Sequence, residues 1–593
     1  MSRSRAETRL RAPDPRWDEP PPVDIDAVDL LVAHLKLPRT LCSILVARGV
    51  ADPETAKRLL RPRFDHLADP RLLRDGVVAA RRIADAVRSG ETILVHGDYD
   101  VDGICSTALL TRFLRARGGT VVPFVPHRLR DGYDFSQAGL RAALEAGAGL
   151  VVTADCGTVA HATVDEAREA GVDVVVTDHH TVSESLPSAR AVVNPQRPDC
   201  DYPDKGLCGA GLAYRTCQLV AAEIGGSSDD LSDLVDLVAL ATIADLVPLE
   251  GENRVLVHYG LRRMTQSRWA GVRALLEVSD VDPSSITAGQ VGFRLAPRIN
   301  AAGRVGESAD ALRLLLTDDD QEARSLAQRL DELNTRRREE DRRTLDEALE
   351  DLVDRFDPTS DFGVVVAGSG WHPGVIGIVA SRVVERLHRP VVMIALDGEK
   401  GRGSARSIPG FHLYDALAEC RDYLDRFGGH RQAAGMDLGV GALDAFRVAF
   451  NGVARERLAG RDLRPTLRPD ADLHLADADL DLVHWLSYLG PHGMGNPSPL
   501  FRARDLRIEG ARVVGERHLK VQLRQGGSRL EAIGFGLAER LNVDALSAEP
   551  FDALFRLERN EWRGRASVQA KLNDLRPARL RAADVDPLEA RAS

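Results

Sequence analysis

Residues 92–107 read TILVHGDYDVDGICST and hold a strand pattern followed directly by the start of a helix pattern. The apolar, β-branched beginning predicts a buried strand, and GICSTALLTRFLRARG at 103–118 predicts an amphipathic helix. Between the two patterns stand His96, Asp98, Asp100 and Asp102. Carboxylates this close repel one another unless a cation lies between them, so we expect a metal site at the end of this strand.

The alternation of strand and helix patterns continues to about residue 200. Strand patterns recur at 120–126 (TVVPFVP), 149–157 (GLVVTADCG) and 172–180 (VDVVVTDHH), with helical patterns between them. Short apolar strands that alternate with helices are typical of a doubly wound parallel sheet. The fold class expected from this region is therefore α/β.

The rest of the chain predicts several further units, because 593 residues are too many for one hydrophobic core. A mixed-charge run at 307–353 predicts a long connecting helix, and the short strand patterns after 465 predict a β-barrel. We expect two α/β domains joined by this helix, followed by the barrel. The expected boundaries are a disordered leader at 1–25, a helical segment at 26–74, a catalytic α/β domain at 75–265, a helical connector at 266–355, a second α/β domain at 356–460, the barrel at 465–580 and a tail at 581–593.

Composition excludes several classes of protein. A net charge of -11 argues against a generally basic nucleic-acid coat, although it leaves room for a local basic channel. No uncharged apolar run approaches the roughly 18 residues that a membrane span needs. The seven cysteines are scattered and form no CxxC pair, so neither a disulfide framework nor a zinc ribbon is indicated, and we expect a cytoplasmic protein.

Polar side chains gather where the expected strands end, which is where ligands bind in doubly wound sheets. After the run from His96 to Asp102 come Asp155, the run Asp178–His179–His180, and Asp245 at the end of an apolar helix. A mixture of carboxylates and imidazoles suits Mn²⁺, with Mg²⁺ as the alternative. His179 and His180 diverge on an extended backbone, so that one can bind metal while the other faces a phosphate, and Asp178 can orient a histidine.

Two less specific interpretations compete with a metal centre. DYDVDG resembles the start of a calcium EF-hand loop, but the twelfth residue from Asp98 is Leu109, where that loop needs a bidentate acid. Each polar cluster taken alone is also compatible with a helix cap, a solvated turn or a buried histidine. The coincidence of such clusters at the strand and helix ends of one domain favours the metal centre.

These motifs resemble those of the DHH phosphoesterase superfamily. The segments that resemble the superfamily motifs are HGDYDVDG at 96–103, TADCG at 153–157, TDHH at 177–180 and TIADLVPL at 242–249. RINAAGR at 298–304, GWHPGVIGIVASR at 370–382, GRGSARSIPGFHL at 401–413 and FGGHRQAAGM at 427–436 narrow the resemblance to the RecJ family of single-strand-specific 5′→3′ DNA exonucleases. The resemblance implies a DHH domain, a DHHA1 domain and a terminal OB-fold.

The resemblance also implies roles for particular residues. Asp102, Asp155, His179 and Asp245 would hold one divalent cation, and His96, Asp100 and Asp155 the other, with Asp98 shaping the loop or sharing a water. His180, oriented by Asp178, and His430 would contact the substrate phosphate. Arg128, Ser404 and Arg406 would bind the 5′ end of the DNA, Tyr133 would stack on a base, and Asn300 and Arg304 would line the channel.

The implied function is two-metal hydrolysis of single-stranded DNA from a free 5′ end to 5′-mononucleotides, in DNA recombination and repair. Single-strand-binding protein and a helicase are the partners that the resemblance suggests, no membrane is expected to be involved, and we expect a monomer. Two alternatives stay open. One is a DHH phosphodiesterase for short oligoribonucleotides or cyclic dinucleotides, and the other is a non-catalytic DHH replication scaffold.

Overall fold

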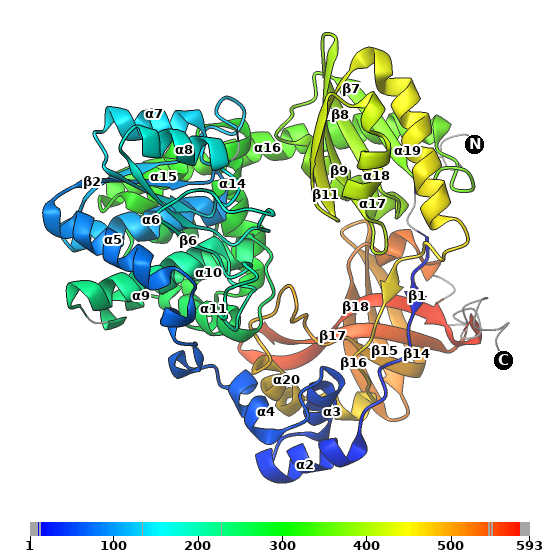
Figure 1. The fold of residues 1–593 in the computed structure, drawn as a ribbon. Coiled ribbons are helices and arrows are strands. Elements are labelled where there is room, and N and C mark those ends of the chain that lie inside the picture. Colours follow the sequence, from blue (N-terminus) through cyan, green and yellow to red (C-terminus); the bar gives the residue numbers. More distant parts are fainter. Residues whose placement is uncertain are drawn as a thin grey trace.

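The chain folds into two α/β units and a β-barrel (Figure 1). The structure is a computed structural model that describes residue 10 and residues 13–132, 134–226, 228–543, 546 and 549–580, without the side chains of residues 228–230 and 562. Helix α16 (Asp320–Arg355) joins the two α/β units. The expected fold class is confirmed.

The first α/β unit is built on a parallel sheet with the strand order β3-β2-β4-β5-β6. From β2 the chain passes to β3 on one side, and it then returns to the other side for β4, β5 and β6. The direction of winding therefore reverses between β2 and β4, and ligands bind at such a switch point. The strands are β2 (Thr92–Gly97), β3 (Thr120–Phe124), β4 (Leu150–Ala154), β5 (Asp173–Thr177) and β6 (Ala191–Val193).

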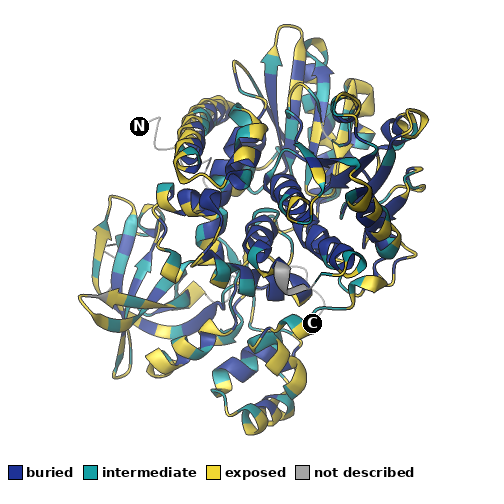
Figure 2. Cartoon of the chain, turned by 90° about the vertical axis from the view of Figure 1, so that its left-hand side faces the viewer, coloured by how far each residue is buried: buried dark blue, intermediate teal, exposed yellow. Residues whose placement is uncertain are grey.

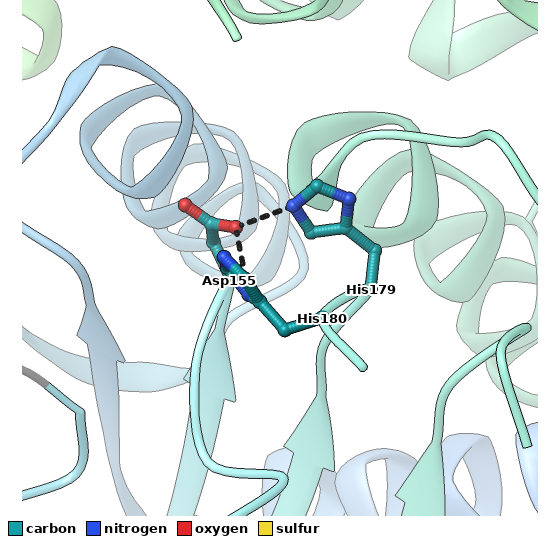
Figure 3. Close-up of side chains that lie close together, drawn as sticks. All are labelled: Asp155, His179 and His180. Carbon is teal, nitrogen blue, oxygen red and sulfur yellow. Dashed lines mark ion pairs between the residues drawn. The ribbon is translucent and has the colours of Figure 1, made fainter. Parts of the chain in front are cut away.

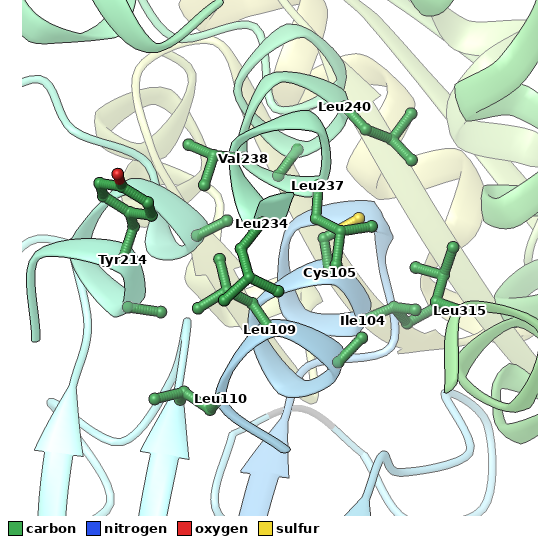
Figure 4. Close-up of a cluster of buried hydrophobic side chains, with 14 of the residues drawn as sticks. Ile104, Cys105, Leu109, Leu110, Tyr214, Leu234, Leu237, Val238, Leu240 and Leu315 are labelled. Carbon is green, nitrogen blue, oxygen red and sulfur yellow. The ribbon is translucent and has the colours of Figure 1, made fainter. Parts of the chain in front are cut away.

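Helix α6, which follows β2, lies at the centre of the first unit. Its side chains Ile104 and Leu109 pack with Leu237 and Val238 of α10 and with Tyr214 of α9 (Figure 4). Each leucine buried in this way contributes about 1.5–3 kcal/mol. The helices of the unit are α5 (Gly76–Ser89), α6 (Val101–Ala116), α7 (Gln137–Glu145), α8 (His161–Glu169), α9 (Gly209–Ile224), α10 (Val235–Ala244) and α11 (Gly251–Met264).

The core of the first unit continues beyond the expected boundary at residue 265. It takes in buried side chains from the next helices and from the first part of α16, as far as Leu333. These helices bury their apolar faces on the first unit, so only the second half of α16 is free to act as a connector. They are α12 (Ala270–Val278), α13 (Ala288–Gln290), a π-helical turn (Val291–Leu295), α14 (Ala296–Val305) and α15 (Ser308–Leu316).

The helix expected over 307–353 is divided in two, α15 and α16. The chain breaks at Thr317–Asp319, where the side chain of Asp319 accepts a hydrogen bond of 2.7 Å from the backbone N–H of Glu322. This is an N-cap that starts a new helix.

The second α/β unit has the strand order β10-β11-β9-β8-β7, in which only the β7–β8 pair is parallel. Helices α17 and α19 pack on this sheet, as does α18. The elements are β7 (Val364–Ser369), α17 (Ile376–Leu387), β8 (Val391–Asp397), β9 (Lys400–Arg406), α18 (Leu413–Glu419), β10 (Arg426–Gly429), β11 (Ala433–Gly439) and α19 (Leu443–Leu458).

The third unit is a closed barrel in which β14 pairs with both β15 and β17. Helices α2, α3 and α4 from the N-terminal segment share its hydrophobic core. The N-terminal helical segment is thus packed on the C-terminal barrel. The elements are β12 (Thr466–Leu467), β13 (Ala471–Asp472), α20 (Leu480–Ser487), β14 (Phe501–Val514), β15 (His518–Gln525), β16 (Ser528–Gly534), β17 (Phe551–Trp562) and β18 (Arg565–Pro577), with α2 (Ile25–Leu35), α3 (Arg39–Ala47) and α4 (Pro53–Leu60).

Part of the expected disordered leader is ordered, which corrects that prediction for residues 13–25. β1 (Arg16–Trp17) pairs with β12, and Trp17 is buried. The indole N–H of Trp17 donates a hydrogen bond of 2.8 Å to Asp574, and the guanidinium of Arg576 lies 4.2 Å from the ring centroid. One tryptophan in a Pro- and charge-rich stretch is enough to anchor the segment, because it buries a large apolar area.

Buried residues, dark blue in Figure 2, lie in the strands and on the inward faces of the helices, and exposed residues lie on the outer helix faces. Among the residues described, no helix has both the length and the apolar character that crossing a membrane requires. All seven cysteines are free and buried.

Asp236 of α10 predicts a pH dependence of stability. It is fully buried and accepts hydrogen bonds from the Leu237 backbone N–H and the Ser267 hydroxyl, and burial raises its pKa to about 7. Because the folded state holds the proton more tightly than the unfolded chain, this stabilising contribution is full below about pH 4 and is lost as the pH rises to about 7.

We therefore expect Asp236→Asn to gain on the order of 2–4 kcal/mol relative to wild type between pH 4 and pH 8. Thermal unfolding of both proteins at the two pH values measures this difference. An equal difference in melting temperature at both pH values would contradict the prediction.

Candidate active site

The loop after β2 brings three carboxylates to the switch point of the sheet. Asp98 is buried, with 4% of its surface exposed. Asp100 caps α6 by accepting hydrogen bonds from the backbone N–H groups of Asp102 and Gly103, at 2.9 and 3.1 Å. The cap fixes the turn, and it leaves the Asp98, Asp100 and Asp102 side chains at the same end of the sheet.

Asp102 is held by the N-terminus of α9. Its two carboxylate oxygens accept hydrogen bonds from the backbone N–H groups of Gly209 and Ala210, at 2.6 and 2.7 Å. The positive end of a helix dipole stabilises a carboxylate in this position. A Cβ at Gly209 would lie 2.6 Å from the Cβ of Asp155, so only glycine lets α9 approach this closely.

Asp155 follows β4 and faces the two histidines that follow β5 (Figure 3). Its Oδ1 lies 3.0 Å from Nε2 of His179 and 3.9 Å from Nδ1 of His180. The same Nε2 of His179 is 3.7 Å from a carboxylate oxygen of Asp102 and 3.7 Å from one of Asp245. Asp155 adopts φ +65°, a left-handed conformation that directs its side chain into the cluster.

The electrostatics of the cluster favour bound cations. Burial and the neighbouring carboxylates of Asp102 and Asp100 raise the pKa of Asp155 well above its ordinary value. Burial and the same two carboxylates raise the pKa of Asp245 to about 8. Divalent cations would relieve both the desolvation and the repulsion.

The donor atoms divide into overlapping groups that suit two divalent cations. One group is Asp102, His179 and Asp245, another is Asp98, Asp100 and Asp155, and a third joins Asp155 to both histidines; within each, the donor atoms lie within 4.8 Å of one another. Apart from their 3.0 Å contact with each other, the buried Oδ1 of Asp155 and Nε2 of His179 have no hydrogen-bond partner among the described residues. The residues present therefore fit Mn²⁺ or Mg²⁺.

His96 lies apart from these groups, and Asp98 stands where His96 was expected. The His96 ring is buried between Phe124 and Phe135, its Nδ1 lies 3.5 Å from the Cys156 sulfur, and burial lowers its pKa to about 4. Its Nε2 has no hydrogen-bond partner in the described part of the chain. The second group in the described chain thus consists of carboxylates, with Asp98 beside Asp100 and Asp155, and the ligand role implied for His96 stays a prediction.

Comparison with known proteins places this geometry in a family. Three family models match: the DHH family, N-terminal domain (residues 92–242), the DHHA1 domain (361–456) and the RecJ OB domain (469–574). A protein of Dickeya dadantii named single-stranded-DNA-specific exonuclease RecJ is 39% identical over 91% of this chain and 96% of its own length. The chain belongs to the RecJ family.

Other members of the RecJ family agree with this assignment. The Bacillus subtilis protein of the same name is 36% identical over 94% of this chain and 70% of its own length. The crystal structure of Thermus thermophilus RecJ in complex with Mn²⁺ has a TM-score of 0.80 and 34% identity and covers 95% of this chain and 79% of that one. The Mg²⁺ complex has a TM-score of 0.75 and 32% identity, with 96% and 79% covered.

In this RecJ-family chain the second histidine of the TDHH motif, His180, has a carboxylate partner of its own. Nδ1 of His180 lies 2.8 Å from Asp178, which also accepts hydrogen bonds from the backbone N–H groups of Thr158 and His179. Burial disfavours the charged imidazole, but the hydrogen bond and charge of Asp178 outweigh it and raise the pKa of His180 to about 9. The hydrogen bond with Asp178 thus orients the His180 ring and favours its protonated form.

Arginines from both α/β units meet beside this cluster. Burial, together with the positive charges of Arg128, Arg406 and Arg337, lowers the pKa of Arg304 to about 10. Burial and the charge of Arg128 also lower the pKa of Arg406. Arg128 lies over the ring of Tyr99, at 4.8 Å from the centroid. A bound anion would stabilise such partly desolvated, mutually repelling cations.

The other predicted substrate residues have different surroundings. Ser404 lies on β9, and its hydroxyl accepts a hydrogen bond of 3.2 Å from Arg406. Asn300 is half-buried on α14, one turn before Arg304. His430 is exposed in the turn between β10 and β11, and no contact in the described chain joins it to the acidic cluster. Tyr133 lies outside the described residues.

Sequence reasoning missed Gly209 and Ala210, which hold Asp102, and it did not single out Arg337 within the mixed-charge run. The small residues of CGAGLA at 208–213 were the available signal for the first two, because they allow close helix approach. The run NTRRREEDRR gave no signal for Arg337, since nothing in it distinguishes the inward-facing arginine.

Proposed function

We propose that this chain is a 5′→3′ exonuclease that hydrolyses single-stranded DNA to 5′-mononucleotides. The observation that carries the proposal is that a ligand set for two cations lies beside mutually repelling arginines of both α/β units, with Arg128 over the ring of Tyr99 in the acidic loop. A terminal phosphate held by the arginines would put the first internucleotide phosphate near the metal ligands. The RecJ relatives named single-stranded-DNA-specific exonucleases support the choice of substrate.

In this proposal Asp102, His179, Asp245 and Asp155 hold one divalent cation, and Asp98, Asp100 and Asp155 hold the other. Two such cations supply a nucleophilic water at neutral pH and neutralise charge on the scissile phosphate. Asp155 would belong to both ligand sets. The cap on α6 and the backbone N–H groups of α9 keep Asp100 and Asp102 in place when substrate binds.

His180 acts on the phosphate itself. Its Nε2–H donates to a non-bridging oxygen of the scissile phosphate, while Asp178 keeps the imidazolium charged and oriented. Water adds to phosphorus as the P–O3′ bond breaks. The terminal nucleotide departs with a 3′ hydroxyl, and the remaining strand keeps a 5′ phosphate for the next cycle.

End-labelled substrates test the function. With Mn²⁺, a 5′-labelled single strand should release labelled mononucleotide from the first time points, its 3′-labelled twin should shorten progressively, and a blunt duplex should persist. Immediate release of a 3′-terminal mononucleotide would overturn the polarity. Cleavage of dinucleotides or cyclic dinucleotides alone would overturn the substrate, and absence of cleavage with Mn²⁺ or Mg²⁺ would favour the scaffold.

Arg406→Gln should weaken recognition of the DNA end. Loss of a charged hydrogen bond to a terminal phosphate costs about 1.5–3 kcal/mol, so kcat/KM for a 5′-phosphorylated strand should fall about 10- to 100-fold. A 5′-hydroxyl strand should be affected much less, because it has no terminal phosphate to lose. Equal losses on both strands would contradict the assignment of Arg406.

Partners and location follow from the substrate. We propose that a helicase and single-strand-binding protein present the strand, that the barrel holds the downstream DNA, and that the enzyme acts in the cytoplasm as a monomer in recombination and repair.

Similarity to RecJ relatives over more than nine-tenths of the chain, barrel included, speaks against the shorter-substrate phosphodiesterase. The intact metal ligands speak against the scaffold.

A further inference from the structure

Helix α16 has a polar segment, residues 334–344, between two hydrophobic cores. The first core ends on this helix at Leu333, and the second begins with Ala348, with Leu345 packed against its edge. Between them the buried residues of α16 are Asn334, Asp341 and Thr344. Figure 1 shows that α16 runs from the first α/β unit to the second. Buried polar residues at a junction cost stability, so their presence points to a task there.

Asp341 is the charged residue among the buried residues of this polar segment. It is 0% exposed, and its Oδ1 has no hydrogen-bond partner in the described chain. Its Oδ2 lies 2.9 Å from Arg382 of α17 and 3.6 Å from Arg337 of α16. The charge of Arg304 on α14 acts on it as well. One carboxylate thus pairs with arginines of two helices and interacts with the charge of Arg304 on a third. Arg304 and Arg337 belong to the group of arginines beside the acidic cluster.

Helix α17, which Asp341 contacts through Arg382, packs against Ser404 and Arg406 of β9. A Cβ on Gly377, in the first turn of α17, would lie 2.8 Å from the Ser404 hydroxyl and 3.0 Å from the Arg406 guanidinium. The backbone just before α17 meets the first unit, since Arg304 donates a hydrogen bond of 3.0 Å to the carbonyl of Gly374. The position of α17 therefore sets the distance between Arg304 and the Ser404–Arg406 pair.

We propose that Asp341 is a positioning residue that fixes this distance for a terminal 5′ phosphate. The carboxylate anchors α17 through Arg382 and offsets the mutual repulsion of Arg304 and Arg337 while the site holds no anion. Without that charge the arginines of the two units move apart, and they no longer bind the terminal phosphate together. This inference rests on the proposed function, because it needs DNA with a 5′ phosphate as substrate.

The test compares 5′-phosphorylated and 5′-hydroxyl single strands of one sequence with wild type and Asp341→Asn. A displaced binding group costs about 10- to 100-fold, so the ratio of kcat/KM values, phosphate over hydroxyl, should fall by about that factor. Cleavage of the hydroxyl strand itself and the Mn²⁺ affinity should change little. An unchanged ratio would overturn the inference.

Glu347→Gln is the matched control. Glu347 also joins α16 to the second unit, by a 2.6 Å hydrogen bond from the Trp371 indole. The arginine that it pairs with is Arg343, which is not one of the arginines around Asp341. An equal fall in the phosphate-over-hydroxyl ratio for Glu347→Gln would show that any weakened contact between the two units has this effect. That result would overturn the proposal. Arg382→Gln is the second variant if Asp341→Asn does not fold, since Arg382 is 43% exposed, and its ratio should fall in the same direction.

Wild-type results separate the two proposals. If wild type leaves every single strand intact, the proposed function fails, and this inference fails with it. If wild type cuts single strands but does not distinguish 5′ phosphate from 5′ hydroxyl, the exonuclease stands and the role of Asp341 is refuted.

Discussion

Asp155→Asn should lower the exonuclease rate by on the order of 10⁴-fold, the effect of removing a central catalytic group. Asp155 is the carboxylate shared by the two proposed cation sites, so one substitution weakens both. Asparagine is the best replacement, because it tolerates the left-handed conformation at φ +65° better than alanine does. Initial rates with saturating Mn²⁺ and a titration of bound metal measure the effect.

The same variant should not be less stable without metal. Burial and neighbouring carboxylates disfavour a charged Asp155, so a neutral amide should leave the melting temperature of the metal-free protein equal or higher. Metal should stabilise wild type more than the variant. Asp165→Asn on the outer helix α8 is the control and should keep full activity. A variant with wild-type rate and metal binding would contradict the assignment of Asp155.

Gly103→Ala should also inactivate the enzyme, although Gly103 carries no chemistry. A Cβ there would lie 2.4 Å from the backbone nitrogen of Asp98 and 2.5 Å from its carbonyl oxygen. Either the loop or the first turn of α6 must move. A displacement of about 1 Å at a catalytic group costs about 10²-fold in rate, and overpacking costs about 1–3 kcal/mol in stability.

The matched substitution is Gly452→Ala in α19, where nothing lies within 4 Å of the added Cβ. Alanine favours a helix, so this variant should keep its rate and be slightly more stable. Rates, metal binding and melting temperatures of both variants measure the contrast. A Gly103→Ala protein as active as the Gly452→Ala protein would show that the approach of α6 to the Asp98 loop does not fix the site.

The parts of the fold that the sequence predicts are those with strong local patterns. The strands from β2 to β5 were predicted because apolar, β-branched runs alternate with helices, and the acidic motifs stand directly at their ends. β6, with three residues, is too short to give a pattern. The break before α16 was missed because a capping aspartate among many charged residues is inconspicuous.

The composition of the site could be predicted better than its internal geometry. The spacing of His96, Asp98 and Asp100 does not reveal which side chain turns inward, because this depends on packing: His96 is buried between two phenylalanines, whereas Asp98 faces Asp100 and Asp155. Likewise the roles of Arg337 and Asp341 follow from the place where α16 passes between the two units. Contacts between segments far apart in sequence decide both cases.

Crystals grown with Mn²⁺ test the central claim most directly, by anomalous diffraction at the manganese edge. The account predicts two Mn²⁺ peaks per chain that share Asp155, one bound by Asp102, His179 and Asp245 and the other by Asp98 and Asp100. A single peak, or two peaks that do not share Asp155, would contradict it.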